Sequence, residues 1–198
     1  MAYLIPIILS LLLGYGLGSI PFGLILTKAT GGGDLRSIGS GNIGATNVLR
    51  TGKKWLAALT LLLDLMKGLA AVLIAARFFP GCEAIAAAGA FFGHLYPVWL
   101  RFEGGKGVAT YAGIMFGLFW QGGVVYAVAW IGALILFRIS SLSGLIAALC
   151  APIAAYYFGR GDLVPLLIAC SLIVFWKHRE NIERLLSGNE PRVGSKSK

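Results

Sequence analysis

The chain has 198 residues, of which 58% are hydrophobic and only 13% charged, and its mean hydropathy is +0.81. A soluble domain carries nearly twice that share of charged residues, so the composition excludes a separate soluble domain and indicates an integral membrane protein. The 17 Lys and Arg against 8 Asp and Glu give a net charge of +9, which in a membrane protein is first a signal of topology. We predict an all-α, polytopic bundle of transmembrane helices that contacts the lipid bilayer and binds no nucleic acid.

Six stretches carry almost no charge and predict transmembrane helices, because about 20 helical residues cross a hydrocarbon core of about 30 Å. They are 1–27, 55–79, 84–100, 107–137, 139–159 and 163–176. The fourth has 31 residues, which as a single helix would measure about 46 Å and would need strong tilt. A break at 121–123, where two glycines follow a glutamine, divides it in two and gives about seven spans.

The basic residues decide between six and seven spans, because Lys and Arg accumulate on the cytoplasmic side. With seven spans, 14 of them lie inside, only Arg77 and Arg160 lie outside, and Lys67 lies within a span; with six, the count is 8 against 8. We therefore expect the N-terminus outside and the C-terminus in the cytoplasm. The segments 108–120 and 163–176 are short for full spans, so half-depth helices stay open there.

The first predicted cytoplasmic loop contains GSGNIGATNVLR at residues 39–50. Glycines let successive backbone N–H groups turn toward an anion, and the hydroxyl and amide side chains add hydrogen-bond donors. The guanidinium at the end of the motif can bind a phosphate through two hydrogen bonds. A flexible linker is the alternative, but linkers seldom contain Asn and Thr at this density. The polar candidates are Ser40, Asn42, Thr46, Asn47 and Arg50.

The second predicted cytoplasmic loop contains EGGKGVAT, residues 103–110, with Lys106 between glycines just before a predicted helix. The N-terminus of a helix attracts anions through its free N–H groups and its dipole, and an ammonium group beside it strengthens the attraction. The motif lacks the glycine spacing and the hydroxyl residue of a nucleotide-binding P-loop. Gly105 and Lys106 are the candidate anion ligands, and a purely topological role for Lys106 is the alternative.

Two charged residues, Asp64 and Lys67, stand within the second predicted span, three positions apart and therefore on one face of a helix. Charged side chains in hydrocarbon pair with each other or face a polar cavity, so a structural ion pair and a substrate contact both stay open. His94 precedes Pro97 near the end of the third span, where a packing or capping role is expected.

The predicted cytoplasmic tail opens with KHRENIERLLSGNE, residues 177–190, whose weak apolar stripe is typical of an amphipathic helix at the membrane surface. His178 and Asn181 lie on this segment beside the apolar stripe. Ser141 adds a hydroxyl at the same predicted membrane face.

The sequence contains no metal-ligand cluster, no dinucleotide-binding motif and no Ser-His-Asp order, so we expect neither a metal nor a cofactor. Cys82, Cys150 and Cys170 are widely spaced and are interpreted as packing residues. The residues alone indicate a membrane protein that binds phosphorylated molecules from the cytoplasm. They do not separate lipid chemistry from transport.

At GSGNIGATNVLR, GGKGVAT and HRENIERLLSGNE the sequence closely resembles the acyl-phosphate-dependent glycerol-3-phosphate acyltransferases of bacteria, from about Gly18 to Glu190. The resemblance implies one acyltransferase domain over 1–190 in the cytoplasmic membrane, with a disordered tail over 191–198. It implies transfer of a fatty acyl group from acyl phosphate to the sn-1 hydroxyl of glycerol 3-phosphate, which gives lysophosphatidate and phosphate and begins phospholipid synthesis. The soluble enzyme that makes acyl phosphate is a further expected partner.

The resemblance also assigns residues. Ser40, Thr46, Asn47 and Ser141 would hold the acyl-phosphate head, and Arg50, Lys106, His178 and Asn181 would hold glycerol 3-phosphate and the reacting centre. Asp64, Lys67 and Gly68 match the family's Asp-x-x-Lys-Gly element, whose role stays open.

Acyl phosphate already carries a good leaving group, so a protein nucleophile is unnecessary. The hydroxyl proton could go to His178 or to a phosphate oxygen of a substrate. The alternative function is a membrane transporter of organophosphates or other anions, which should show internal repeats and ionisable residues at the midplane. No repeat appears, and only Asp64 and Lys67 lie within a span.

Overall fold

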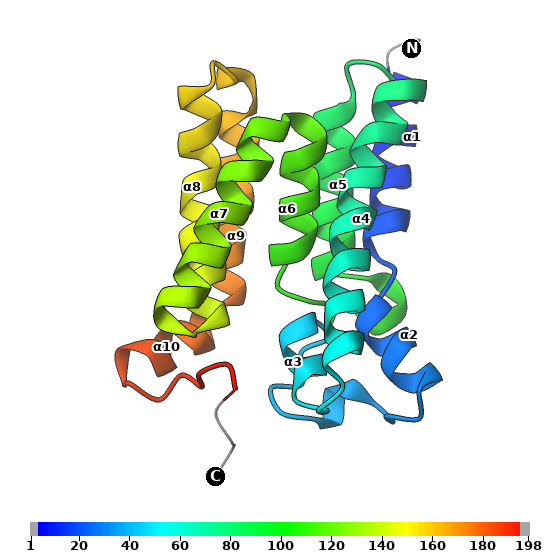
Figure 1. Cartoon of the computed structure of the whole chain (residues 1–198). Helices are drawn as coiled ribbons and strands as arrows, with labels where there is room; N and C mark the ends of the chain where they lie inside the picture. Colours follow the sequence, from blue (N-terminus) through cyan, green and yellow to red (C-terminus); the bar gives the residue numbers. More distant parts are fainter. Residues whose placement is uncertain (1–3, 195–198) are drawn as a thin grey trace. The chain divides into compact units, whose positions relative to one another are not determined.

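The computed structural model describes residues 4–194, and all the regular elements in that range are helices (Figure 1). The chain divides into two compact units, Met1–Leu118 and Phe119–Lys198, which are described one at a time below. The all-helical fold predicted from the composition is confirmed.

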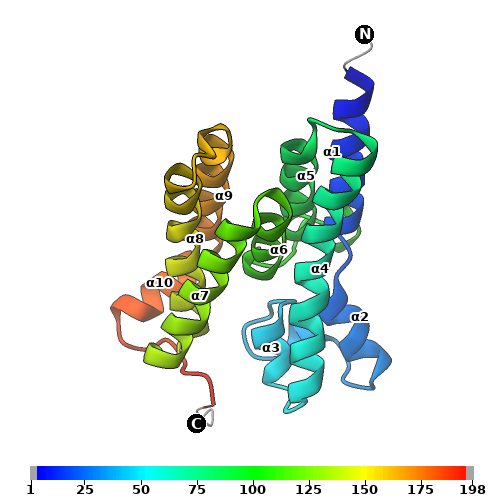
Figure 2. The same ribbon diagram turned by 45° about the horizontal axis from the view of Figure 1, so that its top comes forward.

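Unit 1 contains the helices α1 (Leu4–Gly18), α2 (Phe22–Ala29), α3 (Ala45–Leu49), α4 (Lys54–Phe78), α5 (Glu83–Leu95) and α6 (Val108–Leu118). Helix α1 packs along α5, and α4 contacts α1, α5 and α6, as Figure 1 and Figure 2 show. The contact between α1 and α5 depends on glycine, because a Cβ at Gly14 or Gly18 would collide with the backbone of Ala86 or Ala90. Small residues of this kind let two membrane helices approach closely.

A break divides the first predicted span into α1 and α2. Pro21 precedes α2 and has no N–H group to continue the hydrogen-bond ladder of α1, so the chain turns at residues 19–21. A small apolar core joins α2, α3 and the start of α4 with the loop that follows α2. Its buried members are Leu35, Val48, Leu56 and Ala57, and Leu24, Leu26 and Leu49 pack against them.

Unit 2 contains α7 (Trp120–Phe137), α8 (Ser140–Tyr157), α9 (Val164–Lys177) and α10 (Arg179–Leu186). Helix α8 packs against both α7 and α9, and the Ser171 hydroxyl donates to the Ala148 carbonyl across 2.6 Å. The chain bends by 62° between α9 and α10.

The break in the long fourth stretch lies earlier than the glycines suggested. Helix α6 ends at Leu118 and α7 begins at Trp120, because Phe119 between them adopts extended backbone with φ −163° and ψ 118°. The glycines at 122 and 123 lie inside α7 and are buried, so they do not interrupt the helix.

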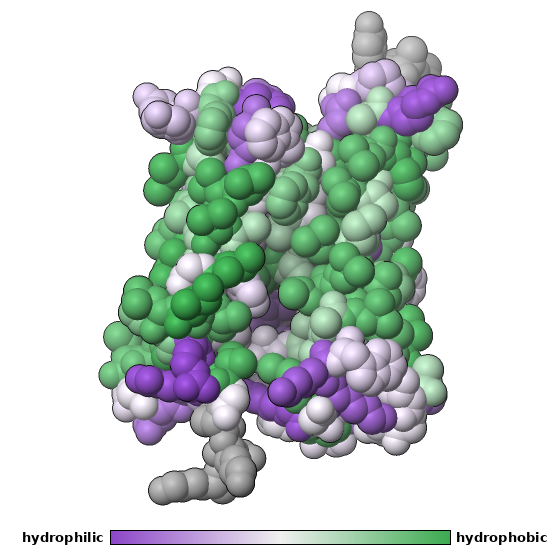
Figure 3. Space-filling view, in the orientation of Figure 1, coloured by the Kyte–Doolittle hydropathy of each residue, from purple (hydrophilic) through white to green (hydrophobic). Residues whose placement is uncertain are grey.

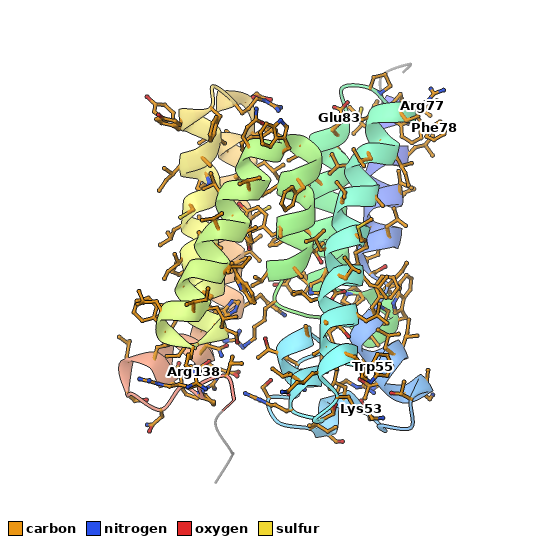
Figure 4. The ribbon with its side chains drawn as sticks, in the orientation of Figure 1. Lys53, Trp55, Arg77, Phe78, Glu83 and Arg138 are labelled. Atoms are coloured by element: carbon orange, nitrogen blue, oxygen red, sulfur yellow. The ribbon has the colours of Figure 1, made fainter. Side chains whose placement is uncertain are left out.

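Within residues 4–194, four helical stretches are long and apolar enough to cross a membrane, or up to five if the bent pair α9–α10 forms one span. The four candidates cover Leu4–Ala29, Lys54–Phe78, Trp120–Phe137 and Ser140–Tyr157. Hydrophobic side chains cover the flanks of the helices in each unit, and hydrophilic ones gather at the helix ends (Figure 3). In unit 1, Arg77 and Glu83 lie at one end of the bundle and Lys53 at the other (Figure 4).

Candidate functional site

Loop 39–50 of unit 1 is organised by the buried side chain of Asn47. Its amide nitrogen lies 3.0, 2.9 and 2.8 Å from the carbonyl oxygens of Leu35, Ile38 and Asn42. Its Oδ1 accepts from the backbone N–H of Ser40 at 3.2 Å. One carboxamide therefore ties backbone groups that precede the motif to backbone groups within it.

The same arrangement holds Arg50 at the surface beside Ser40. Gly39 has a φ of +54°, and a Cβ there would lie 2.6 Å from Cδ of Arg50 and 2.7 Å from Oδ1 of Asn47. Glycine is therefore required both by the backbone conformation and by the approach of the arginine. Ser40, Thr46 and Arg50 are exposed, so the loop presents two hydroxyls and a guanidinium from one compact segment.

Asn42 has a different task from Asn47. Its Oδ1 accepts a hydrogen bond of 2.9 Å from the backbone N–H of Gly44, the residue that precedes α3. This local turn lets the chain enter α3 directly after the glycine-rich segment.

Loop 96–107 folds back onto the end of α5. The N–H groups of Gly104 and Gly105 donate to the carbonyls of Leu95 and His94 at 3.1 and 3.0 Å, which satisfies two carbonyls that the helix end would leave without partners. Lys106 follows at once, and the chain enters α6 at Val108. The structure thus places Lys106 beside the start of a helix, as predicted.

Loops 39–50 and 96–107 lie at the same end of unit 1 (Figure 1, Figure 2). The pKa of Arg36 is raised, mainly by its hydrogen bond to Asp34 and to a smaller degree by the charge of Glu103 in the second loop. Arg36, which precedes loop 39–50, therefore lies within electrostatic range of Glu103 in loop 96–107.

Asp64 and Lys67 form an ion pair inside unit 1, with 2.7 Å between Nζ and Oδ1 and only 4% and 2% of the two side chains exposed. Lys67 also donates to the carbonyl of Ile20 in the break between α1 and α2, at 2.8 Å. Nδ1 of His94 lies 3.8 Å from the same Asp64 oxygen. Of the two readings left open by the sequence, these contacts support the structural ion pair.

In unit 2, His178 lies at the bend between α9 and α10 and is 3% exposed. Its Nδ1 is 2.8 Å from the carbonyl oxygen of Val174. A carbonyl only accepts, so Nδ1 carries the hydrogen and Nε2 is the basic nitrogen of the neutral ring.

Glu190 gathers the remaining polar residues of unit 2. Its Oε1 accepts from Ser141 at 2.6 Å and from Asn181 at 2.5 Å, and its Oε2 accepts from Arg184 at 2.7 Å. Burial acts to raise the pKa of Glu190, but the three hydrogen bonds together outweigh it and hold the pKa below its ordinary value of 4.5. Arg138, labelled in Figure 4, exchanges hydrogen bonds of 2.6 and 3.1 Å with the backbone of Val193.

Glu190 and Arg184 are the residues that the sequence argument missed. The signal was present, because both belong to the third motif, but a glutamate near an expected phosphate site did not suggest a binding role. The structure brings Ser141 and Asn181 within hydrogen-bond distance of one carboxylate oxygen, a shared partner that the sequence did not predict. Of the tail expected to be disordered, 191–194 is described and 195–198 lies outside the described residues.

The chain matches known proteins over nearly its whole length. The family model of glycerol-3-phosphate acyltransferases matches residues 8–188. Proteins named glycerol-3-phosphate acyltransferase from Mesorhizobium japonicum and Rhodopseudomonas palustris are both 59% identical to it, over 190 and 191 residues. Both alignments cover 96% of this chain, and they cover 97% and 96% of the relatives.

Two solved structures are similar to the chain. Both are crystal structures of PlsY (YgiH), an integral membrane glycerol 3-phosphate acyltransferase. The glycerol 3-phosphate form is 35% identical with a TM-score of 0.87, covering 98% of this chain and 96% of that one. The lysophosphatidic acid form is 34% identical with a TM-score of 0.88, covering 95% of each. The chain therefore belongs to the glycerol-3-phosphate acyltransferase family and is an acyltransferase of the membrane.

Proposed function

We propose that this chain transfers a fatty acyl group from acyl phosphate to the sn-1 hydroxyl of glycerol 3-phosphate, releasing lysophosphatidate and phosphate. The observation that carries the proposal is the similarity to PlsY in two forms, with glycerol 3-phosphate and with lysophosphatidic acid, which are the acceptor and the product of one acyl transfer. The three polar motifs, with their hydroxyls and cations, suit two phosphorylated substrates. An enzyme that makes acyl phosphate would supply the donor.

The residues divide between the two substrates. Ser40, Thr46 and Ser141 contact the acyl-phosphate head, and Arg50, Lys106, His178 and Asn181 hold glycerol 3-phosphate. Asn42, Asn47 and Gly105 shape the loops that carry these ligands, since Asn42 accepts from a backbone N–H, Asn47 donates to backbone carbonyls and Gly105 donates to the carbonyl of His94. We propose that 1–190 is one acyltransferase domain, and the family match over residues 8–188 supports this because it includes residues of both units.

The reaction is a direct transfer. The hydroxyl oxygen of glycerol 3-phosphate attacks the acyl carbonyl carbon, the new ester bond forms, and the bond from that carbon to the phosphate oxygen breaks. The hydroxyl proton passes to Nε2 of His178 or to a phosphate oxygen of a substrate. The protein's part is to align the two substrates and to neutralise two phosphates, which requires no nucleophilic side chain.

The test uses detergent-solubilised protein with acyl phosphate and glycerol 3-phosphate in the absence of any sealed membrane. The enzyme makes lysophosphatidate under these conditions, whereas a transporter makes none. Incubation with acyl phosphate alone, followed by mass spectrometry of the intact protein, should show no acyl adduct. A stoichiometric adduct that glycerol 3-phosphate discharges would overturn the direct transfer.

We also propose the topology, with seven spans in the cytoplasmic membrane of a bacterium, the N-terminus outside and both glycine-rich loops inside. The biased distribution of Lys and Arg supports it. Cys82, between α4 and α5, should react with an impermeant thiol reagent added to intact cells, and a Cys82→Ser protein is the control for the other two cysteines. A cysteine introduced at Ser197 should stay unlabelled, and its labelling would reject the orientation.

A further inference from the structure

We propose that His94 is a positioning residue of this enzyme: its ring, between Asp64 and Gly105, sets the position of the loop that presents Lys106 to the substrate. The inference rests on the proposed role of Lys106 in binding glycerol 3-phosphate. It gives a function to the buried ion pair that the proposed chemistry leaves unused.

The ring of His94 lies directly against the backbone of Gly105. A Cβ at this position would collide with Nε2 of the ring and lie 2.7 Å from Cε1. The His94 carbonyl also accepts from the N–H of Gly105 at 3.0 Å. One residue of α5 therefore contacts Gly105 through both its ring and its backbone, next to Lys106.

The other edge of the ring faces the carboxylate of Asp64 in α4. Nδ1 lies 3.8 Å from Oδ1 of Asp64, and the ring is almost fully buried, with 4% of its side chain exposed. Asp64 is paired with Lys67 at 2.7 Å, and Lys67 is bonded to the carbonyl of Ile20. The ammonium of Lys67 also lies 5.8 Å from the centre of the Phe22 ring.

These contacts join α4, α5, the break between α1 and α2, and loop 96–107. A buried charge that loses its partner is expensive, so the pair holds its geometry and the ring has a rigid support. A displacement of about 1 Å in a substrate-binding group can change a rate by about a hundredfold. The fit of the ring against Gly105 is therefore expected to set how well Lys106 meets the substrate phosphate.

Exchanging the sizes of the two residues tests this fit. Gly105→Ala alone places a methyl group where the ring lies, and His94→Ala alone removes the support. Each should raise the KM for glycerol 3-phosphate about tenfold and change kcat and the KM for acyl phosphate by less than about threefold. In the double variant the methyl group occupies space that the ring has left, so its KM should stay near that of either single variant, whereas independent effects would multiply to about a hundredfold.

Gly104→Ala is the matched control. The three atoms nearest to its Cβ would be the carbonyl oxygens of His94 and Leu95 and Cδ of Pro97, none of them in the ring of His94, so its effect should multiply with that of His94→Ala. His94→Asn is a second test, because its amide keeps a polar group near the place of Nδ1 but lacks Nε2 and Cε1. If His94→Ala does not fold, His94→Asn takes its place, and His94→Asn combined with Gly105→Ala should likewise show a KM near that of either single variant.

The outcomes separate the inference from the proposed function. Multiplicative effects of His94 and Gly105 substitutions, or an unchanged KM in His94→Ala, would overturn the positioning role while leaving the function intact. Lys106→Ala is measured alongside. An unchanged KM for glycerol 3-phosphate in Lys106→Ala would overturn the proposed role of Lys106, and with it the inference.

Discussion

The two segments that carry most of the candidate ligands are organised by chemically opposite side chains. In loop 39–50 the organiser is the neutral carboxamide of Asn47, whose two N–H groups are shared among three carbonyls and whose oxygen accepts from Ser40. In segment 178–190 the organiser is the carboxylate of Glu190, which accepts from Ser141, Asn181 and Arg184.

The difference shows where cationic charge is available for a substrate. A carboxamide holds a loop without adding charge, so the guanidinium of Arg50 keeps its full attraction for phosphate. A carboxylate gathers donors more strongly, but it neutralises Arg184 and adds a negative charge beside two predicted substrate ligands. Electrostatic attraction is therefore expected to come mainly from unit 1, and unit 2 is expected to contribute oriented neutral donors.

Replacing the carboxamide of Asn47 with a carboxylate should have the largest effect on kcat/KM. Asn47→Asp keeps the shape but cannot donate to the three carbonyls, and each buried group left without a partner costs about 1 to 3 kcal/mol. We expect a loss of about a hundredfold or more in kcat/KM, with a lower Tm. Asn42→Asp is the matched control, since Asn42 Oδ1 only accepts and a carboxylate can replace it. Equal losses in both variants would show that added charge, rather than lost donors, is responsible.

Removing the available cation should have the next largest effect. Arg50→Ala and Lys106→Ala each lose a charge-assisted contact worth about 1.5 to 3 kcal/mol, which is about tenfold to more than a hundredfold in kcat/KM. Arg50→Lys should also be damaging, because an ammonium cannot reproduce the two hydrogen bonds of a guanidinium. Steady-state kinetics with varied glycerol 3-phosphate measures this. Near-normal values in both alanine variants would contradict the assignment of charge to unit 1.

The contrast also explains which parts of the fold and of the candidate site could be predicted from the sequence. Hydrophobic length predicted the long apolar helices but not the short α3 or the division between α1 and α2, and motif composition located both loops and the segment after α9. The exact breaks depended on backbone geometry: Phe119 is extended although nothing in its side chain requires it, whereas Pro21 makes the break after α1 understandable.

The organisers were harder to predict because their partners are distant in the chain. Asn47 reaches a carbonyl 12 residues earlier, and Glu190 reaches a hydroxyl 49 residues earlier. Spacing rules for helices and turns cover only neighbours, so they could name these polar residues but not their partners. The same reason left the contact of His94 with Gly105 outside the sequence argument.

Weakening the charged organiser should have a moderate effect. In Glu190→Gln the oxygen can still accept from Ser141 and Asn181, but the amide group faces the N–H of Arg184, so we expect a several-fold lower kcat/KM and a Tm lower by a few degrees. The folded pKa lies below 4.5, so the stabilisation is present above pH 4.5 and is lost as the pH falls through the lowered pKa. Thermal unfolding from pH 7 downward should show this loss in the parent protein and a smaller one in Glu190→Gln. A loss of equal size in both would assign the acid sensitivity to other groups.

The smallest effect is expected from the exposed ion pair of Asp34 with Arg36 in the loop that leads to residue 39. The two side chains are 48% and 47% exposed, and the hydrogen bonds from Arg36 lower the pKa of Asp34 to about 2. Exposed pairs are screened by salt and contribute little, so Asp34→Asn should leave kcat/KM within about twofold of the parent value. The measurement is made at low and at high salt. The contrary outcome is a loss of tenfold or more in kcat/KM for Asp34→Asn, with a similar loss in the parent protein at high salt. It would mean that surface charge, and not the buried carboxamide of Asn47, holds this loop in shape.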